Sequence, residues 1–301
     1  MHQVFKLLVA IFIVVLLTVE YLARRRQRFH EKSSGQDTVR SEEISNFKKI
    51  VCLFVCLIPI LLGVIIPTFV LLNFVLSGFS IINFTEILGI AFSSITIAAI
   101  SALVVMIISL LMIVVPNYKS NSIQRILIFL SSCGYAFPGT ILAVGIVVFV
   151  GWLNDLIYFH LSYFVGGFII LIFAYTTRFL AVCNGAINSG ILRIHPNLFD
   201  ASRIMGISFF QSIRKVILPL VYANLLAGGI LVFVDILKEL PMTLLLRPFN
   251  FETLATYVYQ YASDELLEES SFAALIIIFV GLGPVIFLSN TIKNITNKKQ
   301  S

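Results

Sequence analysis

The stretch 198-LFDASRIMGISFFQSIRKVILPL-220 interrupts a chain that otherwise consists largely of long apolar runs. Gly206, in its middle, permits the left-handed conformation that ends a helix. Ser208 opens an S-x-x-Q capping-box pattern that begins another helix. The pattern predicts a rigid helix–glycine–helix elbow whose second helix ends at the Leu218-Pro219 pair. Because a solvated loop does not need this construction, we expect a docking surface of mixed apolar and charged side chains.

The composition is that of a membrane protein. The chain has 301 residues, of which 59% are hydrophobic and only 12% charged, whereas soluble domains are about one quarter charged. Since lipid tolerates only helices and closed barrels, and the apolar runs are too long for barrel strands, we expect an all-α, polytopic transmembrane helical bundle. Pro138 and Pro284 fall inside apolar runs and predict kinks. The seven predicted spans cover residues 3–22, 50–76, 87–115, 126–151, 161–183, 217–240 and 272–290.

Lys and Arg residues collect in alternate connections between these runs. The segment 23–49 holds eight of them, 116–125 and 184–216 hold more, and the tail 291–301 adds three; the other connections hold only Arg247. By the positive-inside rule the basic connections are cytoplasmic, so we expect a periplasmic N-terminus and a cytoplasmic C-terminus. Because the basic residues lie in alternate connections, the net charge of +6 is explained by membrane topology. We therefore expect no nucleic-acid partner.

The basic segment also divides the chain. We expect a leading transmembrane helix at 1–22, a basic cytoplasmic linker at 23–49 and a transmembrane domain at 50–290. A cytoplasmic loop at 196–216 interrupts this domain, and a cytoplasmic tail at 291–301 follows it. Because most of the chain consists of these transmembrane segments, the lipid bilayer is the first partner that the sequence predicts.

Motifs for chemistry are absent from the sequence. It contains no GxxxxGK[ST] loop for ATP, no H-E-x-x-H and no GxSxG, and its Cys and His residues show no metal-ligand spacing. We therefore expect no enzyme and no cofactor bound by this chain. Arg178 is expected near the cytoplasmic end of its helix, where its side chain would extend to the interface.

The cytoplasmic loop resembles the EAA loop of binding-protein-dependent ABC importer permeases. That pattern is Glu-Ala-Ala, three residues, Gly, nine residues, an aliphatic residue, any residue and Leu-Pro. Asp200 stands in place of Glu, and Ser202 in place of the second Ala. The resemblance implies a coupling helix that docks in a groove of cytoplasmic ABC ATPase subunits, which use the ATP. The residues at the positions of this pattern are Asp200, Ala201, Ser202, Gly206, Val216, Leu218 and Pro219.

Three further stretches, 134-GYAFPGTILAVG-145, 178-RFLAVCNGAI-187 and the long segment 232–265, resemble the ferric-iron branch of these permeases. The similarity covers about 50–290. It implies the type I importer permease fold in the bacterial cytoplasmic (inner) membrane. It also implies that a periplasmic ferric-binding protein delivers Fe(III). A permease for another small solute, such as thiamine, polyamine or phosphate, stays open, as does a membrane scaffold or enzyme.

Three charged residues, Asp235, Lys238 and Glu239, follow Pro219 along the same apolar run. At 1.5 Å per residue Asp235 lies about 24 Å from Pro219, which places the group near the outer mouth. Asp235 and Glu239 are four residues apart and would share a helix face, so their carboxylates are candidates for receiving Fe(III). The alternative is a structural role, in which Lys238 neutralises the acids or they bond neighbouring helices. Whether the chain holds a metal elsewhere stays open.

The number of predicted helices implies an incomplete pathway. Six helices plus one line only half of the cavity that this architecture needs, and segment 1–49 resembles the last helix and linker of a preceding permease half. We therefore expect a second permease half as partner, packed against 3–22. A homodimer is the weaker alternative, and a truncated or mis-started product stays open.

Overall fold

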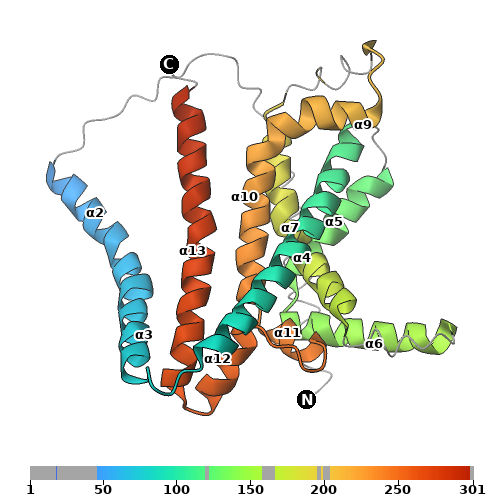
Figure 1. The fold of residues 1–301 in the computed structure, drawn as a ribbon. Coiled ribbons are helices and arrows are strands. Elements are labelled where there is room, and N and C mark those ends of the chain that lie inside the picture. The colour runs from blue at the N-terminus through green and yellow to red at the C-terminus, as the bar shows by residue number, and fades with distance from the viewer. Residues whose placement is uncertain are drawn as a thin grey trace. The chain divides into compact units, whose positions relative to one another are not determined.

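The computed structural model describes residues 18, 46–118, 122–157, 167–194, 198 and 204–298. Every regular element in these ranges is a helix (Figure 1), which confirms the all-α prediction. Apart from Thr18, the predicted leading helix at 1–22 lies outside the described residues. The elements are α2 (Asn46–Ile60), the π-helix η1 (Leu61–Ile65), α3 (Ile66–Ser77), α4 (Phe84–Tyr118), α5 (Ser122–Ala136), α6 (Gly139–Ile157), α7 (Phe168–Ile191), α9 (Phe209–Ser212), the π-helix η3 (Ile213–Ile217), α10 (Leu218–Leu237), α11 (Pro241–Leu246), α12 (Leu254–Ser263) and α13 (Leu267–Lys298).

Five helices in the described part of the chain are long and apolar enough to cross a membrane. Each overlaps a predicted span, although the observed bounds are shifted or extended by several residues in some of them. Their lengths follow from the need to satisfy every backbone N–H and C=O within the helix while it lies in hydrocarbon. They are Phe47–Ser77, Phe84–Pro116, Phe168–Ile191, Phe209–Leu237 and Leu267–Phe287.

The predicted span 126–151 is not one straight helix. Its two halves, Ile126–Ala136 and Gly139–Asp155, are bent by 118° relative to each other. The break falls at Pro138, which has no N–H to donate and which disfavours helical geometry in the residue before it. The kink predicted at Pro138 is thus confirmed, and the two halves form either one broken span or a re-entrant loop. Pro284, by contrast, lies within an uninterrupted α13.

The chain divides into two compact units, Met1–Leu57 and Ile58–Ser301. Within the second unit, α7 packs against α4, α5 and α10, and these helices form the main apolar core. A smaller cluster joins α12 and α13 to the first turns of α4. Tyr175 of α7 and Leu254 of α12 are among the large side chains that are fully buried in these two clusters. The central position of α7 therefore brings its polar side chains into contact with residues of the surrounding helices.

Small and polar side chains hold the core helices close together. A Cβ on Gly134 of α5 would lie 2.1 Å from the carbonyl oxygen of Thr177 on α7, so only glycine allows this approach. The buried Asn184 of α7 donates to Ser131 Oγ of α5 at 2.9 Å and accepts from Ser109 Oγ of α4. This amide therefore links three helices.

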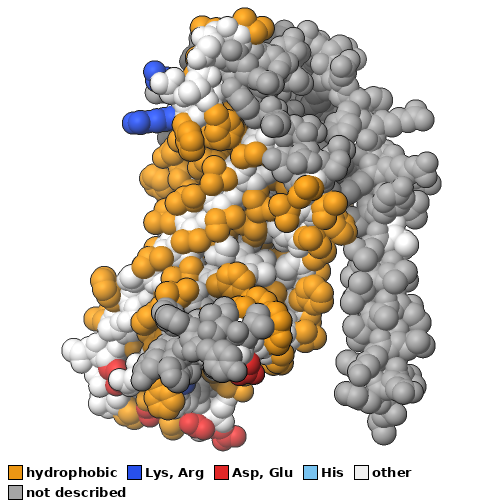
Figure 2. All heavy atoms as spheres, turned by 90° about the vertical axis from the view of Figure 1, so that its right-hand side faces the viewer, with side chains coloured by type: hydrophobic (Ala, Val, Ile, Leu, Met, Phe, Trp, Pro, Cys, Tyr) orange, Lys and Arg blue, Asp and Glu red, His pale blue; other side chains and the backbone are white. Residues whose placement is uncertain are grey.

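Charged side chains lie at opposite ends of the described surface. Figure 2 shows apolar side chains over its middle, Lys and Arg beyond one edge, and Asp and Glu beyond the other. Arg214 and Lys215, just before α10, are exposed, and so are Glu86, Asp264 and Glu265 near the first turns of α4 and α13. An apolar belt between two charged ends is the arrangement that a bilayer requires.

Candidate functional site

The structure describes the glycine and the second helix of the predicted elbow, but most of its first helix lies outside the described residues. Gly206 has φ of +70°, which confirms the predicted left-handed residue. Ser208 is the N-cap of α9, but its side chain makes no capping hydrogen bond, so the predicted capping box does not form. Its carbonyl oxygen instead accepts from Ser212 N at 2.8 Å. The predicted loop residues Asp200, Ala201 and Ser202 lie outside the described residues.

The second helix does not end at the Leu218-Pro219 pair, and that prediction is wrong. α9 continues through η3 into α10, and Leu218 has helical angles of φ −55° and ψ −45°. A proline ring crowds the carbonyl four residues earlier, and a wider π turn directly ahead of Pro219 relieves this conflict. The ribbon turns between α9 and α10 without losing its helical course (Figure 1).

Exposed apolar side chains cluster around the elbow. Ile204 is 87% exposed, Met205 75% and Phe210 76%. Arg214 and Lys215 are exposed beside them. We call these five residues the Gly206 ridge. The buried side chains of η3 attach the ridge to the core, and Val216 between them is half-buried. Apolar groups at a basic, solvent-facing end are typical of a surface that a partner covers.

The predicted outer cluster separates into two ion pairs. Lys238 Nζ lies 2.9 Å from Asp235 Oδ1, and the lysine side chain is 64% exposed. α10 ends at Leu237, so Glu239 lies beyond the helix. Its carboxylate is 8% exposed and lies 3.2 Å from Arg178 Nη1. The two acids thus have different cationic partners.

Arg178 is not where the sequence placed it. It lies near the middle of α7, and its side chain is 19% exposed, so the predicted position at the cytoplasmic interface is wrong. The apolar run used to predict this helix ends at 183, but the helix continues to Ile191. A charged residue at that depth needs a partner. Glu239, which lies 61 residues later, provides it.

The Arg178–Glu239 pair is enclosed by three segments. Met242 N donates to Glu239 Oε1 at 3.4 Å, at the first turn of α11. Thr243 Oγ1 donates to the Glu239 carbonyl at 2.6 Å and bonds Tyr175 of α7. At the start of α6, a Cβ on Gly139 would lie only 2.0 Å from Arg178 Nη1, so glycine is what admits the guanidinium there. The pair therefore joins α6, α7 and the α10–α11 connection.

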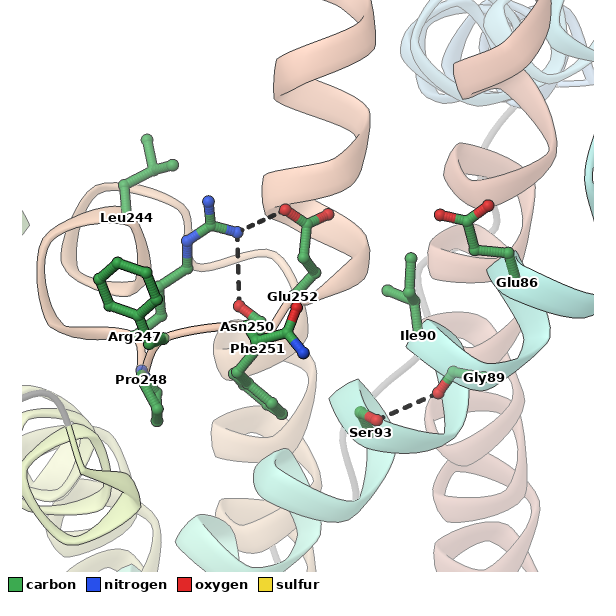
Figure 3. Close-up of a pocket in the computed structure, with 11 residues that line it drawn as sticks. Glu86, Gly89, Ile90, Ser93, Leu244, Arg247, Pro248, Asn250, Phe251 and Glu252 are labelled. Carbon is green, nitrogen blue, oxygen red and sulfur yellow. Dashed lines mark hydrogen bonds and ion pairs between the residues drawn. The ribbon is translucent and has the colours of Figure 1, made fainter.

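A separate polar pocket lies between the first turns of α4 and the connection from α11 to α12 (Figure 3). Its volume is about 640 Å³. Glu86 and Glu252 approach it from opposite walls, and Arg247 Nη1 lies 2.8 Å from Glu252 Oε1. Sequence reasoning missed this pocket because Glu86 and Glu252 are far apart in the chain and share no spacing motif. Among the described residues, no group of three or more His, Cys, Asp or Glu side chains is placed to hold a metal ion.

Comparison with known proteins identifies the fold and the family. Residues 105–299 match the binding-protein-dependent transport system inner membrane component family. The chain belongs to this family. It is therefore a multi-pass membrane protein of the ABC importer type, as the EAA-like loop predicted.

One curated relative carries a named substrate. The chain is 27% identical over 156 residues to the Fe(3+)-transport system permease protein FbpB 2 of Haemophilus influenzae. The match covers 51% of this chain but spans only 29% of the relative's length.

Solved structures share the fold at low identity. A bacterial ABC transporter involved in the import of alginate has a TM-score of 0.62 at 15% identity, covering 83% of this chain and 96% of the other. The same kind of transporter in complex with an alginate pentasaccharide-bound periplasmic protein gives a TM-score of 0.64 at 16% identity, with coverages of 83% and 95%. The inward-facing MetNI methionine transporter gives 0.53 at 15% identity, with coverages of 69% and 95%. These likenesses confirm the type I ABC importer permease fold.

Proposed function

We propose that this chain is the membrane-spanning permease subunit of an ATP-driven importer that moves ferric iron from the periplasm into the cytoplasm. The observation that carries the proposal is the Gly206 ridge. A left-handed glycine, followed at the family's spacing by Leu218-Pro219, presents exposed apolar side chains at the basic end of the bundle. The likeness to an Fe(3+)-transport permease supports the cargo.

The ridge is the proposed docking site for cytoplasmic ABC ATPase subunits. Ile204, Met205 and Phe210 supply the apolar contact, and Arg214 and Lys215 supply charge at its edge. Closure of the ATPases on nucleotide would move the ridge, and the unbroken helical path into α10 would transmit that motion. ATP hydrolysis belongs to those subunits. The basic end that carries the ridge is the proposed cytoplasmic side.

Asp235 and Glu239 are the proposed oxygen ligands for incoming Fe(III) on this chain. Hard trivalent iron favours carboxylate oxygen. The two acids differ in access, because the partner of Asp235 is a mostly exposed lysine, whereas Glu239 is enclosed with Arg178. We therefore assign first contact with the cargo to Asp235, with Lys238 moving aside.

The proposed assembly has three further kinds of partner besides the bilayer. A periplasmic ferric-binding protein would deliver the iron, two ATPase subunits would dock on the cytoplasmic side, and a second permease half would complete the pathway. A second copy of this chain is the alternative to that half.

Uptake of radioactive ferric iron in a strain depleted of the chain tests the proposal. Uptake should fall on depletion and return with the wild-type gene. ATPase subunits should also copurify with the tagged chain. Normal iron uptake together with lost uptake of thiamine, polyamine or phosphate would refute the cargo and keep the importer. Absence of any ATPase from an intact purified complex would refute the importer.

A further inference from the structure

The pocket at the end of the bundle opposite the Gly206 ridge is built from two rigid walls. Glu86, Gly89 and Ser93 follow one face of α4 at helical spacing and form one wall. The other wall is the connection from Leu244 to Glu252. Asn83 Nδ2 donates to Glu86 Oε2 at 3.0 Å, which orients this carboxylate at the start of α4.

The connection that forms the second wall is internally braced. Arg247 Nη1 donates to the Phe251 carbonyl at 3.4 Å as well as contacting Glu252. The Phe251 ring packs edge-on against Phe168 of α7, with centroids 4.9 Å apart. Asn250 takes φ of +59°, which turns the chain sharply. The connection is therefore held by its own contacts.

This braced connection leaves one aromatic ring uncovered. Phe249 is 105% exposed, although Arg247 and Pro248, which precede it, are half-buried. A large apolar ring on a rigid support is the kind of side chain that anchors protein–protein interfaces, because little conformational entropy is lost when it is covered.

The charge of the pocket restricts what can enter it. Two carboxylates and one guanidinium line it, and Asp264 and Glu265 are exposed at the same end of the bundle. An anionic solute or a lipid phosphate would be repelled by this surface. A second permease half would be expected to bring a more apolar surface. A Lys or Arg side chain from a soluble protein matches the charge of this surface, and the pocket of about 640 Å³ has room for it.

We propose that the periplasmic carrier protein docks here, placing a Lys or Arg side chain between Glu86 and Glu252 while Phe249 packs against its surface. This inference rests on the proposed importer function, and it names where the carrier binds and by which chemistry. It requires no particular cargo, since the contacts are with the carrier protein and not with the solute.

The first test is photo-crosslinking from position 249 in cells that express the complete transporter. Replacing Phe249 by p-benzoylphenylalanine keeps an aromatic ring there. Capture of a soluble periplasmic solute-binding protein, identified by mass spectrometry, is the expected result. Capture of a carrier for a solute other than iron would sustain the docking site and refute the ferric cargo. Capture of lipid or of a permease polypeptide alone would overturn the docking site.

The second test measures the affinity of the captured carrier for the purified transporter in nanodiscs. The double variant Glu86→Gln/Glu252→Gln should bind about tenfold more weakly and with a shallower dependence on salt. The matched control, Asp264→Asn/Glu265→Gln, removes two exposed carboxylates from the same end but lines no part of this pocket, so its affinity should change less than threefold. Equal losses in the two double variants, or no loss in either, would overturn the proposed ion contact.

Discussion

Replacing Gly139 by alanine tests whether the Arg178–Glu239 pair is as enclosed as the structure shows. The new Cβ would lie 2.0 Å from Arg178 Nη1 and 2.7 Å from Glu239 Oε1. An ordinary contact needs about 3.4 Å, so the guanidinium must retreat by about 1.4 Å. The variant therefore lengthens the ion pair without removing either charge.

The cost of this displacement follows from Coulomb's law. At the observed separation of 3.2 Å and an effective dielectric constant of about 20, the attraction is about 5 kcal/mol. If the guanidinium and the carboxylate both withdraw to about 3.4 Å from the new Cβ, their separation rises to about 4.6 Å, which lowers the attraction to about 3.6 kcal/mol. We therefore expect Gly139→Ala to destabilise the protein by about 1.5 kcal/mol.

The assay is thermal unfolding of the purified protein in detergent, with Gly145→Ala as the matched control. Gly145 lies in the same helix, and its added Cβ would meet nothing within 4 Å, so alanine there should stabilise by up to about 1 kcal/mol. For a chain of this length, the two variants should differ in Tm by about 4 °C. Equal melting temperatures would refute the enclosed ion pair.

Three other substitutions test separate parts of the structure. Gly206→Val should cost about 1–2 kcal/mol at a left-handed residue and weaken ATPase copurification and transport. Gly206→Asn should retain both, and normal transport by the valine variant with normal subunit stoichiometry would contradict the coupling role. Asp235→Asn and Glu239→Gln, singly and together, should lower iron uptake at equal expression; unchanged uptake in the double variant would leave these acids a structural role only. Asn184→Ala should lower unfolding free energy by about 1–2 kcal/mol, because two interhelical hydrogen bonds are lost, and a Tm equal to wild type would show that they contribute nothing.

Much of the fold follows from properties that are local in sequence. Apolar length alone located the described spans, because lipid leaves a long apolar segment no alternative to a helix. The left-handed conformation of Gly206 was also predictable from local sequence, because glycine has no Cβ and adopts positive φ easily. The EAA-like spacing from Gly206 to Pro219 then indicated the family.

The remaining features depend on contacts that hydropathy does not encode. The length of an apolar run does not show whether two helical pieces are collinear. Pro138 therefore predicted a kink but not the size of the bend, which is 118°. Arg178 and Glu239 are 61 residues apart, and their pairing depends on how α7 and α10 pack. The S-x-x-Q pattern at Ser208 located the N-cap of α9, but the pattern alone does not decide whether the side-chain hydrogen bond forms.

The Arg178–Glu239 ion pair holds α10 at the end away from the Gly206 ridge, so this helix can act as a lever with unequal arms. Its 20 residues rise about 30 Å. Glu239, tied to Arg178, forms the fulcrum just past the last turn. A swing of about 10° around that fulcrum would carry the Leu218 end through roughly 5 Å, but Asp235 through only about 1 Å. A displacement of the ridge by the proposed ATPase partner would therefore reach Asp235 reduced about fivefold.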